Sequence, residues 1–298
     1  MEYVLETEKL TKQYGAQLAA DSISLHIPRG TIYGFIGRNG AGKTTCMKMI
    51  CGLTHPTSGT IRILGLQNSG YDRIGSLIED PGLYYNMTAA QNLRCRCILT
   101  GSDPKKTVMP LLETVGLANA ANKNPSDYSL GMRQRLGIAL ALVGDPEILV
   151  LDEPINGLDP QGIVQVRDML RSLVQERNLT IMISSHILGE LEKLADVFGI
   201  IHKGRLMKEI PAAELSASTS NTLEIRTDDT AKVCSMLAET AFSASVTGAD
   251  TVQIRNAADR SIEINRMLIQ GGCGIIESRI IRSELEDYYL ELTGGAEK

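Results

Sequence analysis

The feature that most constrains the fold is a glycine-rich loop between an apolar segment and a helical one. The segment 31–37 reads TIYGFIG, and the loop from Gly37 to Thr44 reads GRNGAGKT. This loop fits G-x-x-x-x-G-K-[ST] in the strand–loop–helix setting that makes the pattern specific. Its glycines let the backbone curl so that N–H groups point at phosphate oxygens, and the helix N-terminus adds partial positive charge. The sequence therefore predicts a phosphate-binding loop in an α/β domain.

The loop also carries the side chains that a nucleoside triphosphate needs. We expect Lys43 to bridge the β- and γ-phosphates, the Thr44 hydroxyl to hold Mg²⁺, and Thr45 to contact the α-phosphate. The residues expected around the nucleotide here are Gly37, Asn39, Gly40, Ala41, Gly42, Lys43, Thr44 and Thr45.

A second apolar strand, expected over 147–153, ends on the acidic pair Asp152 and Glu153. Asp152 suits coordination of Mg²⁺, and Glu153 suits a general base that orients and deprotonates the attacking water. Two buried, unpaired acids would destabilise the strand, and a bound cation offsets that cost. The pair therefore favours a catalytic role over a structural one.

The pattern of elements divides the chain into two domains. Strands and helices alternate over 147–206, which predicts a parallel sheet with helices on both faces, and the stretch of about 86–144 reads as a helical insertion. A Ser/Thr-rich stretch at 216–222 predicts a linker. Residues 223–298 read as β-α-β-β-α-β, the ferredoxin-like plan, followed by a last helix. We expect an α/β nucleotide-binding domain over 1–215 and a small α+β domain over 223–298.

Composition excludes several classes of function. The net charge of −5 does not indicate the basic surface that nucleic-acid binding requires. No apolar run approaches the ~20 residues that span a bilayer, and no signal peptide is apparent. The six cysteines form no Cys-x-x-Cys pair, and without a secretory signal we expect reduced thiols.

The order of the motifs resembles that of the nucleotide-binding subunit of ATP-binding cassette (ABC) transporters, over residues 1 to about 215. The residues 128–132, YSLGM, match the signature loop, and 157–159, GLD, match the loop that crosses to the partner. Besides the phosphate loop and the acidic strand, the matching positions are Tyr14, Ser129, Gly131, Asp159 and His186.

The resemblance implies a role for each position. Tyr14 stacks on adenine, and His186 contacts the γ-phosphate. Two copies face head to tail, so that each ATP is held between Lys43 of one chain and Ser129 and Gly131 of the other. The resemblance also implies a separate membrane permease and a cytoplasmic location, peripheral on the inner face of the cell membrane.

The sequence departs from the motifs of the family at two places. Glu79 stands where the family has glutamine, and we expect it to ligate Mg²⁺ or orient water through an oxygen. The signature loop has Leu130 and Met132 in place of the usual residues. The Glu-type loop is similar to that of the ATPases that protect bacteria from bacitracin and lantibiotics, and the C-terminal unit is similar to the tail module of bacterial exporter ATPases.

Other interpretations remain beside this one. A GTPase is rejected because 122–125 reads NKNP, with proline where the guanine-binding aspartate belongs. Composition alone does not exclude a small-molecule kinase with an arginine-rich lid, and the motif order argues against it. A non-transport ABC ATPase and a regulatory ATP-binding module are the two rivals. Each single residue also has a structural alternative: Tyr14 as a surface tyrosine, His186 as a strand-end histidine, Ser129 as a helix cap.

Overall fold

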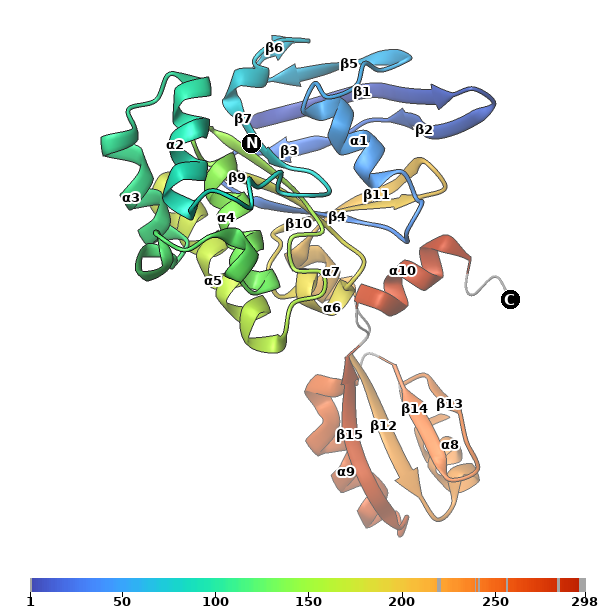
Figure 1. The fold of residues 1–298 in the computed structure, drawn as a ribbon. Coiled ribbons are helices and arrows are strands. Elements are labelled where there is room, and N and C mark those ends of the chain that lie inside the picture. Colours follow the sequence, from blue (N-terminus) through green and yellow to red (C-terminus); the bar gives the residue numbers. More distant parts are fainter. Residues whose placement is uncertain are drawn as a thin grey trace. The chain divides into compact units, whose positions relative to one another are not determined.

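The chain forms two compact units, Met1–Ala212 and Ala213–Lys298 (Figure 1). The computed structural model describes residues 2–218, 221–238, 240, 242–255, 257–282 and 285–294. Among these residues, no helix has both the length and the apolar character needed to cross a membrane.

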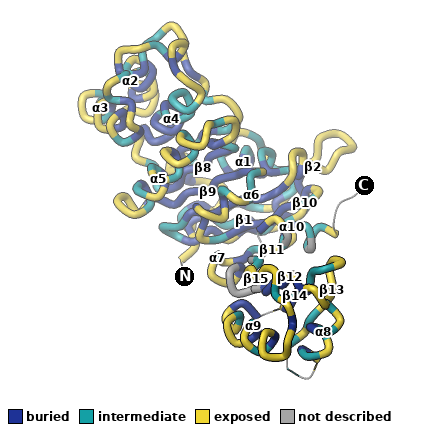
Figure 2. The backbone as a smooth tube through the Cα atoms, turned by 90° about the horizontal axis from the view of Figure 1, so that it is seen from below, coloured by how far each residue is buried: buried dark blue, intermediate teal, exposed yellow. Residues whose placement is uncertain are grey.

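A six-stranded sheet forms the centre of the first unit, in the order β11-β10-β4-β9-β8-β7. Its strands are parallel except β11, which pairs antiparallel with β10. Every residue of β4, β8 and β9 is buried, as expected for parallel strands covered on both faces (Figure 2). The strands are β4 (Ile32–Ile36), β7 (Ile74–Leu77), β8 (Ile148–Asp152), β9 (Thr180–Ser185), β10 (Val197–His202) and β11 (Arg205–Pro211).

A second, antiparallel sheet lies across helix α1 (Lys43–Ile50) from the first. It has the order β2-β1-β5-β6, and β3 pairs with β1. The buried side of α1, which includes Cys46, Met47 and Ile50, joins both sheets in one hydrophobic core. This core fixes the start of α1 against the end of β4. The strands are β1 (Tyr3–Tyr14), β2 (Gln17–Ile23), β3 (His26–Pro28), β5 (Ser58–Ile63) and β6 (Leu66–Gln67).

The helical part of this unit consists of α2 (Ala89–Thr100), α3 (Pro104–Thr114) and α4 (Leu130–Ala141), which pack on one another. Local sequence sets where they begin. Thr88 and Gln91 form a capping box at α2, and Asp103 caps α3 before a proline at its first turn. Two further helices follow β8 and β9, namely α5 (Pro160–Arg177) and α6 (Leu188–Glu192). Short 3₁₀ turns are found at Tyr71–Arg73, Ala118–Ala120, Pro125–Asp127 and, in the second unit, Ala258–Arg260.

The second unit contains an antiparallel four-stranded sheet in the order β13-β14-β12-β15. Helices α8 and α9 contribute Val233, Leu237, Ile264 and Leu268 to one hydrophobic core with the sheet. The element order β-α-β-β-α-β and this strand order are the ferredoxin-like plan, so the predicted fold class is confirmed. The elements are α7 (Ala212–Ser218), β12 (Asn221–Thr227), α8 (Thr230–Ala238), β13 (Ala244–Val246), β14 (Thr251–Ile254), α9 (Ser261–Gln270), β15 (Ile275–Arg282) and α10 (Leu285–Thr293).

Two segments show detail that the sequence pattern left open. The stretch 197–206 contains the end of β10 and the start of β11, because Lys203 and Gly204 turn the chain with φ of 46° and 81°. Two residues at positive φ are what a tight two-residue hairpin requires. In the expected linker at 216–222, α7 extends to Ser218 and β12 begins at Asn221, while positions 219 and 220 lie outside the described residues.

Candidate nucleotide site

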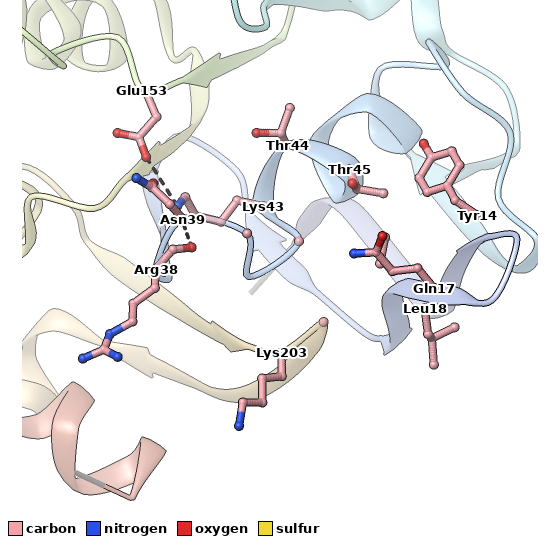
Figure 3. Close-up of a pocket in the computed structure, with 14 residues that line it drawn as sticks. Tyr14, Gln17, Leu18, Arg38, Asn39, Lys43, Thr44, Thr45, Glu153 and Lys203 are labelled. Atoms are coloured by element: carbon pink, nitrogen blue, oxygen red, sulfur yellow. Dashed lines mark hydrogen bonds and ion pairs between the residues drawn. The ribbon is translucent and has the colours of Figure 1, made fainter. Parts of the chain in front are cut away.

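A cavity of about 560 Å³ opens over the phosphate loop, where β4 ends and α1 begins (Figure 3). The chain segments around it come from the tip of the β1–β2 hairpin, the phosphate loop, the end of β8 and the β10–β11 turn. The lining residues are Tyr14, Gln17, Leu18, Ala19, Arg38, Asn39, Gly40, Gly42, Lys43, Thr44, Thr45, Glu153, Lys203 and Gly204.

Two glycines of the loop are required by close backbone approach. A Cβ on Gly42 would lie 2.4 Å from the Ala19 carbonyl oxygen, and Gly42 has a φ of 104°. A Cβ on Gly37 would lie 2.7 Å from the Ile201 carbonyl oxygen. A real Cβ fits at neither position, so the loop keeps its curled path only with glycine there.

Lys43, at the first position of α1, is folded back into the loop. Its side chain is only 5% exposed, and its Nζ donates to the Gly37 carbonyl at 2.6 Å and lies 3.3 Å from Glu153 Oε1. A buried ammonium held by carbonyl oxygens and one carboxylate is poised to exchange these partners for phosphate oxygens.

Asp152, the last residue of β8, is buried between two hydroxyl groups. Thr44 Oγ1 donates to Asp152 Oδ2 at 2.7 Å, and Ser184 Oγ donates to Asp152 Oδ1 at 2.6 Å. The Ser184 hydroxyl also accepts the backbone N–H of Glu153 at 2.9 Å. Ser184 was missed from the sequence, although a serine in an otherwise apolar buried strand signals a hydrogen-bonding role.

Glu153 begins the loop after β8 and connects Lys43 to His186. Its backbone has a φ of 50°, an unusual conformation for a glutamate. Its Oε2 lies 2.8 Å from His186 Nδ1, and its Oε1 is buried with no hydrogen-bond partner apart from the ion pair with Lys43. The cavity therefore brings together the predicted phosphate lysine and base, with the predicted switch histidine directly behind the base.

The outer part of the cavity is formed by residues of the β1–β2 hairpin and the β10–β11 turn. Tyr14 lines it with about half of its side chain exposed, and Lys12 Nζ lies 5.0 Å from the centre of its ring. Gln17, Arg38 and Lys203 also line the cavity and were not predicted. Arg38 and Lys203 add positive charge, and the HKGR sequence of the hairpin turn was the available signal for Lys203.

Eight predicted site residues do not line this cavity. Four of them, Gly37, Ala41, Asp152 and His186, lie next to residues that do, and the other four lie apart from it. Ser129 is the N-cap of α4 and accepts the Met132 N–H at 3.3 Å, and Gly131 lies in the first turn of that helix. Asp159 is the N-cap of α5 and accepts the Gly162 N–H. Glu79 is largely exposed at a φ of 62°, and its Oε1 pairs with Lys48 Nζ at 2.7 Å. Within one chain, these last four residues therefore do not reach the phosphate loop.

Comparison with known proteins identifies the architecture. A family model described as ABC transporter matches residues 20–156. The chain is 45% identical to the Bacitracin transport ATP-binding protein BcrA of Enterococcus faecalis, over 99% of this chain and 98% of that protein. It is 42% identical to the protein of the same name in Bacillus licheniformis, over 99% of both chains. The Lantibiotic transport ATP-binding protein SrtF of Streptococcus pyogenes is 45% identical over 69% of this chain and 90% of its own length.

A solved structure shows the same fold in the first unit. The cbiO1 protein of Clostridium perfringens, described as part of the ABC transporter complex cbiONQ, superposes with a TM-score of 0.67 at 27% identity. The match covers 73% of this chain and 92% of that one. With the cavity, the motif order and the full-length relatives in agreement, the chain belongs to the ATP-binding cassette family, as an ATP-binding and ATP-hydrolysing subunit of the transporter type.

Proposed function

We propose that this chain is the ATPase subunit of an exporter that removes peptide antibiotics of the bacitracin or lantibiotic kind. The observation that carries the proposal is the similarity to two bacitracin transport ATP-binding proteins over 99% of this chain. That similarity includes the C-terminal unit, which the phosphate-binding motifs alone would not require.

ATP would occupy the 560 Å³ cavity with its phosphates over the loop. Lys43 exchanges its carbonyl contacts for β- and γ-phosphate oxygens, and the N–H groups of the loop and the α1 N-terminus bind the remaining charge. Tyr14 stacks on the adenine, while Arg38 and Lys203 increase the positive charge around the triphosphate.

The residues around Thr44 fit a magnesium ion. The Thr44 hydroxyl and the Asp152 carboxylate are 2.7 Å apart, and both offer the oxygen ligands that Mg²⁺ prefers. An ion held by these two oxygens would keep waters and phosphate oxygens as its other ligands. Asp152 and Thr44 would hold the ion, which would supply positive charge to neutralise the phosphates.

Glu153 would accept the proton of the attacking water. Its Oε1 faces Lys43 without a hydrogen bond, while Oε2 is held by His186 Nδ1. Once Lys43 turns to the phosphates, Oε1 is free to bind water, and His186 keeps the carboxylate oriented toward the γ-phosphate. Glu79 would act from outside the cavity, in coupling to the permease.

We further propose that each ATP is completed by a second copy of the chain. The support is that Ser129 and Gly131 form an accessible N-terminus of α4, a suitable anion site, yet lie outside their own chain's cavity. Asp159 would act in the same interface. This homodimer would drive a separate integral membrane permease from the cytoplasmic face of the membrane.

Mixing two inactive variants tests the shared site. Lys43→Ala removes the phosphate lysine, and Ser129→Arg blocks the α4 N-terminus. Each variant alone should hydrolyse no ATP, while a mixture should regain hydrolysis, because one site of the mixed dimer combines an intact Lys43 with an intact Ser129. A mixture as inactive as its components would contradict the shared site.

A growth assay tests the transported compound. Sensitive bacteria expressing this chain with its permease should tolerate more bacitracin or lantibiotic than bacteria carrying the Glu153→Gln variant. The chain should sediment with membranes only when the permease is present. Equal sensitivity with both forms, despite normal ATP hydrolysis by the purified chain, would rule out these antibiotics as the transported compounds. The assignment of the chain as an ATPase would stand.

A further inference from the structure

The C-terminal sheet ends in a long strand with one free edge. Among the described residues, β15 (Ile275–Arg282) pairs only with β12, and it is the last strand in the order β13-β14-β12-β15 (Figure 1). The opposite edge strand, β13, has only three residues. A long free edge presents unpaired N–H and C=O groups that can accept another strand.

Residues 276–280 of β15 are exposed and partly apolar. Ile276 is 61% exposed and Ile280 is 48% exposed. Ser278 Oγ hydrogen-bonds to the Asn265 side chain of α9, so Ser278 points to the helix-covered face of the sheet. Alternation along the strand places Ile280 on that same face. Ile276 is the unpaired residue at a register shift, next to Ile275, which packs on the core of that face. On α9, Ile262 and Ile269 are 76% and 60% exposed, and they flank Asn265 at helical spacing.

Glu277 and Arg279 lie on the opposite face, where they extend a row of charges. Glu277 pairs with Arg226 of β12 at 3.6 Å, and Arg279 contacts Glu224 of β12 through its Nε at 2.7 Å. Charges on an edge strand usually prevent pairing with another chain. Their effect here depends on the register of the incoming strand.

The sequence of β15 is complementary to itself when reversed. Residues 275–281 read IIESRII, with the two charges at mirror positions about Ser278. If two copies pair antiparallel about Ser278, Glu277 of each lies opposite Arg279 of the other, and Ile276 lies opposite Ile280. A shift of two residues in either direction brings Glu277 opposite Glu277, or Arg279 opposite Arg279. Opposite charges across strands stabilise a pair and like charges destabilise it, so the charges select one register.

We propose that two copies of this chain join through β15, in antiparallel register about Ser278, without needing ATP. The joined sheet continues the charge row from Arg226 and Glu277 of one copy to Arg279 and Glu224 of the other. On the helix-covered face, the exposed isoleucines of β15 and α9 gain apolar neighbours. The register shift beside Ile276 leaves Glu277–Arg282 in regular pairing with β12, so the centre of the edge is straight. This contact is separate from the ATP-bridged one.

A cysteine at the symmetry centre tests the register directly. Residues opposite each other in antiparallel strands have Cα atoms about 4.5–5.5 Å apart, within the range for a disulfide. We expect the nucleotide-free full-length Ser278→Cys variant to form a covalent dimer under mild oxidation. Ser245→Cys, on the other edge strand, and the wild type measure the background from other cysteines. Cross-linking of Ser278→Cys no greater than that of Ser245→Cys would overturn the proposal.

Exchanging the charges separates pairing from misfolding. In the Ser278→Cys background, Glu277→Arg gives two positive charges and Arg279→Glu gives two negative charges, so neither variant should cross-link to itself. A mixture of the two should cross-link, because every charge then meets its opposite. Failure of the mixture, with both variants folded by circular dichroism, would refute the register. Because no nucleotide is present, neither result depends on the ATP site.

An apolar substitution gives a second readout without cysteines. By sedimentation without nucleotide, the wild type should have the mass of two chains, and Ile280→Lys should have the mass of one. Val246→Lys, an exposed aliphatic residue of the other edge strand, should keep the wild-type mass. A wild-type mass of one chain at all concentrations tested would contradict the proposal.

Discussion

Ser184 holds the acidic end of β8 in place, and its removal should damage both stability and catalysis. The side chain is fully buried, donates to Asp152 Oδ1 at 2.6 Å and accepts the Glu153 N–H at 2.9 Å. Ser184→Ala deletes both hydrogen bonds while changing little volume. The backbone N–H of Glu153 is then left without a partner, and Asp152 keeps only the hydroxyl of Thr44.

The size of the effect follows from the two bonds. A hydrogen bond to a charged group contributes about 1.5–3 kcal/mol, and a buried donor left unpaired costs about 1–3 kcal/mol. Because Asp152 retains Thr44, we expect a total loss of about 2–4 kcal/mol of unfolding free energy. For a unit of this size, 1 kcal/mol corresponds to about 2–4 °C in melting temperature.

Circular dichroism suits the stability measurement because the chain has no tryptophan. ATP hydrolysis should fall about 10–100-fold and require more Mg²⁺, as expected when a residue that orients a metal ligand is removed. Ser185→Ala is the matched control, since this neighbouring buried hydroxyl accepts the Ile187 N–H instead of holding an acid. Unchanged melting, turnover and Mg²⁺ dependence in Ser184→Ala would show that Ser184 does not position the acidic pair.

Three other changes give distinct outcomes. Glu79→Gln should keep ATP affinity, because Glu79 pairs with Lys48 outside the cavity, and should alter only the permease-stimulated ATPase rate; a changed Kd for ATP would contradict this placement. Gly42→Ala should abolish ATP binding measured by calorimetry, because its Cβ would lie 2.4 Å from a carbonyl oxygen, and normal binding would show that the loop adapts. Hydrogen bonds from Gln253 and Arg279 lower the pKa of Glu224, so its stabilising effect is present above its unfolded pKa of about 4.5 and is lost as pH falls through the lower folded value. The melting difference between wild type and Glu224→Gln should therefore be largest above about pH 5 and shrink toward pH 3; a difference independent of pH would exclude this linkage.

The sequence was sufficient for features set by local pattern. The phosphate loop and the strand ending at Asp152 combine a buried apolar run with residue types that only one local geometry accommodates. The ferredoxin-like order of the second unit could be predicted because strand-like and helix-like hydrophobic patterns alternate along 223–298. Both features could be predicted from the sequence because each depends on residues close together in the chain.

Features that depend on residues far apart in the chain could not be predicted from the sequence. Ser184 acts on Asp152, which lies 32 residues away, and the sequence does not say which strand end a buried serine faces. Lys203 lines the cavity only because the β10–β11 hairpin turns at Lys203 and Gly204. Likewise, the pairing of Glu79 with Lys48 joins a loop to a helix 31 residues away. Register and long-range contacts, set by packing of whole elements, decide such details.

ATP hydrolysis by the Glu153→Gln variant tests most directly whether Glu153 is the general base. The glutamine keeps the size of the side chain but cannot accept the proton of the attacking water. We predict that turnover falls at least about 100-fold, as for loss of a general base, while the affinity for ATP is retained. Hydrolysis at the wild-type rate would show that Glu153 is not the base of this site.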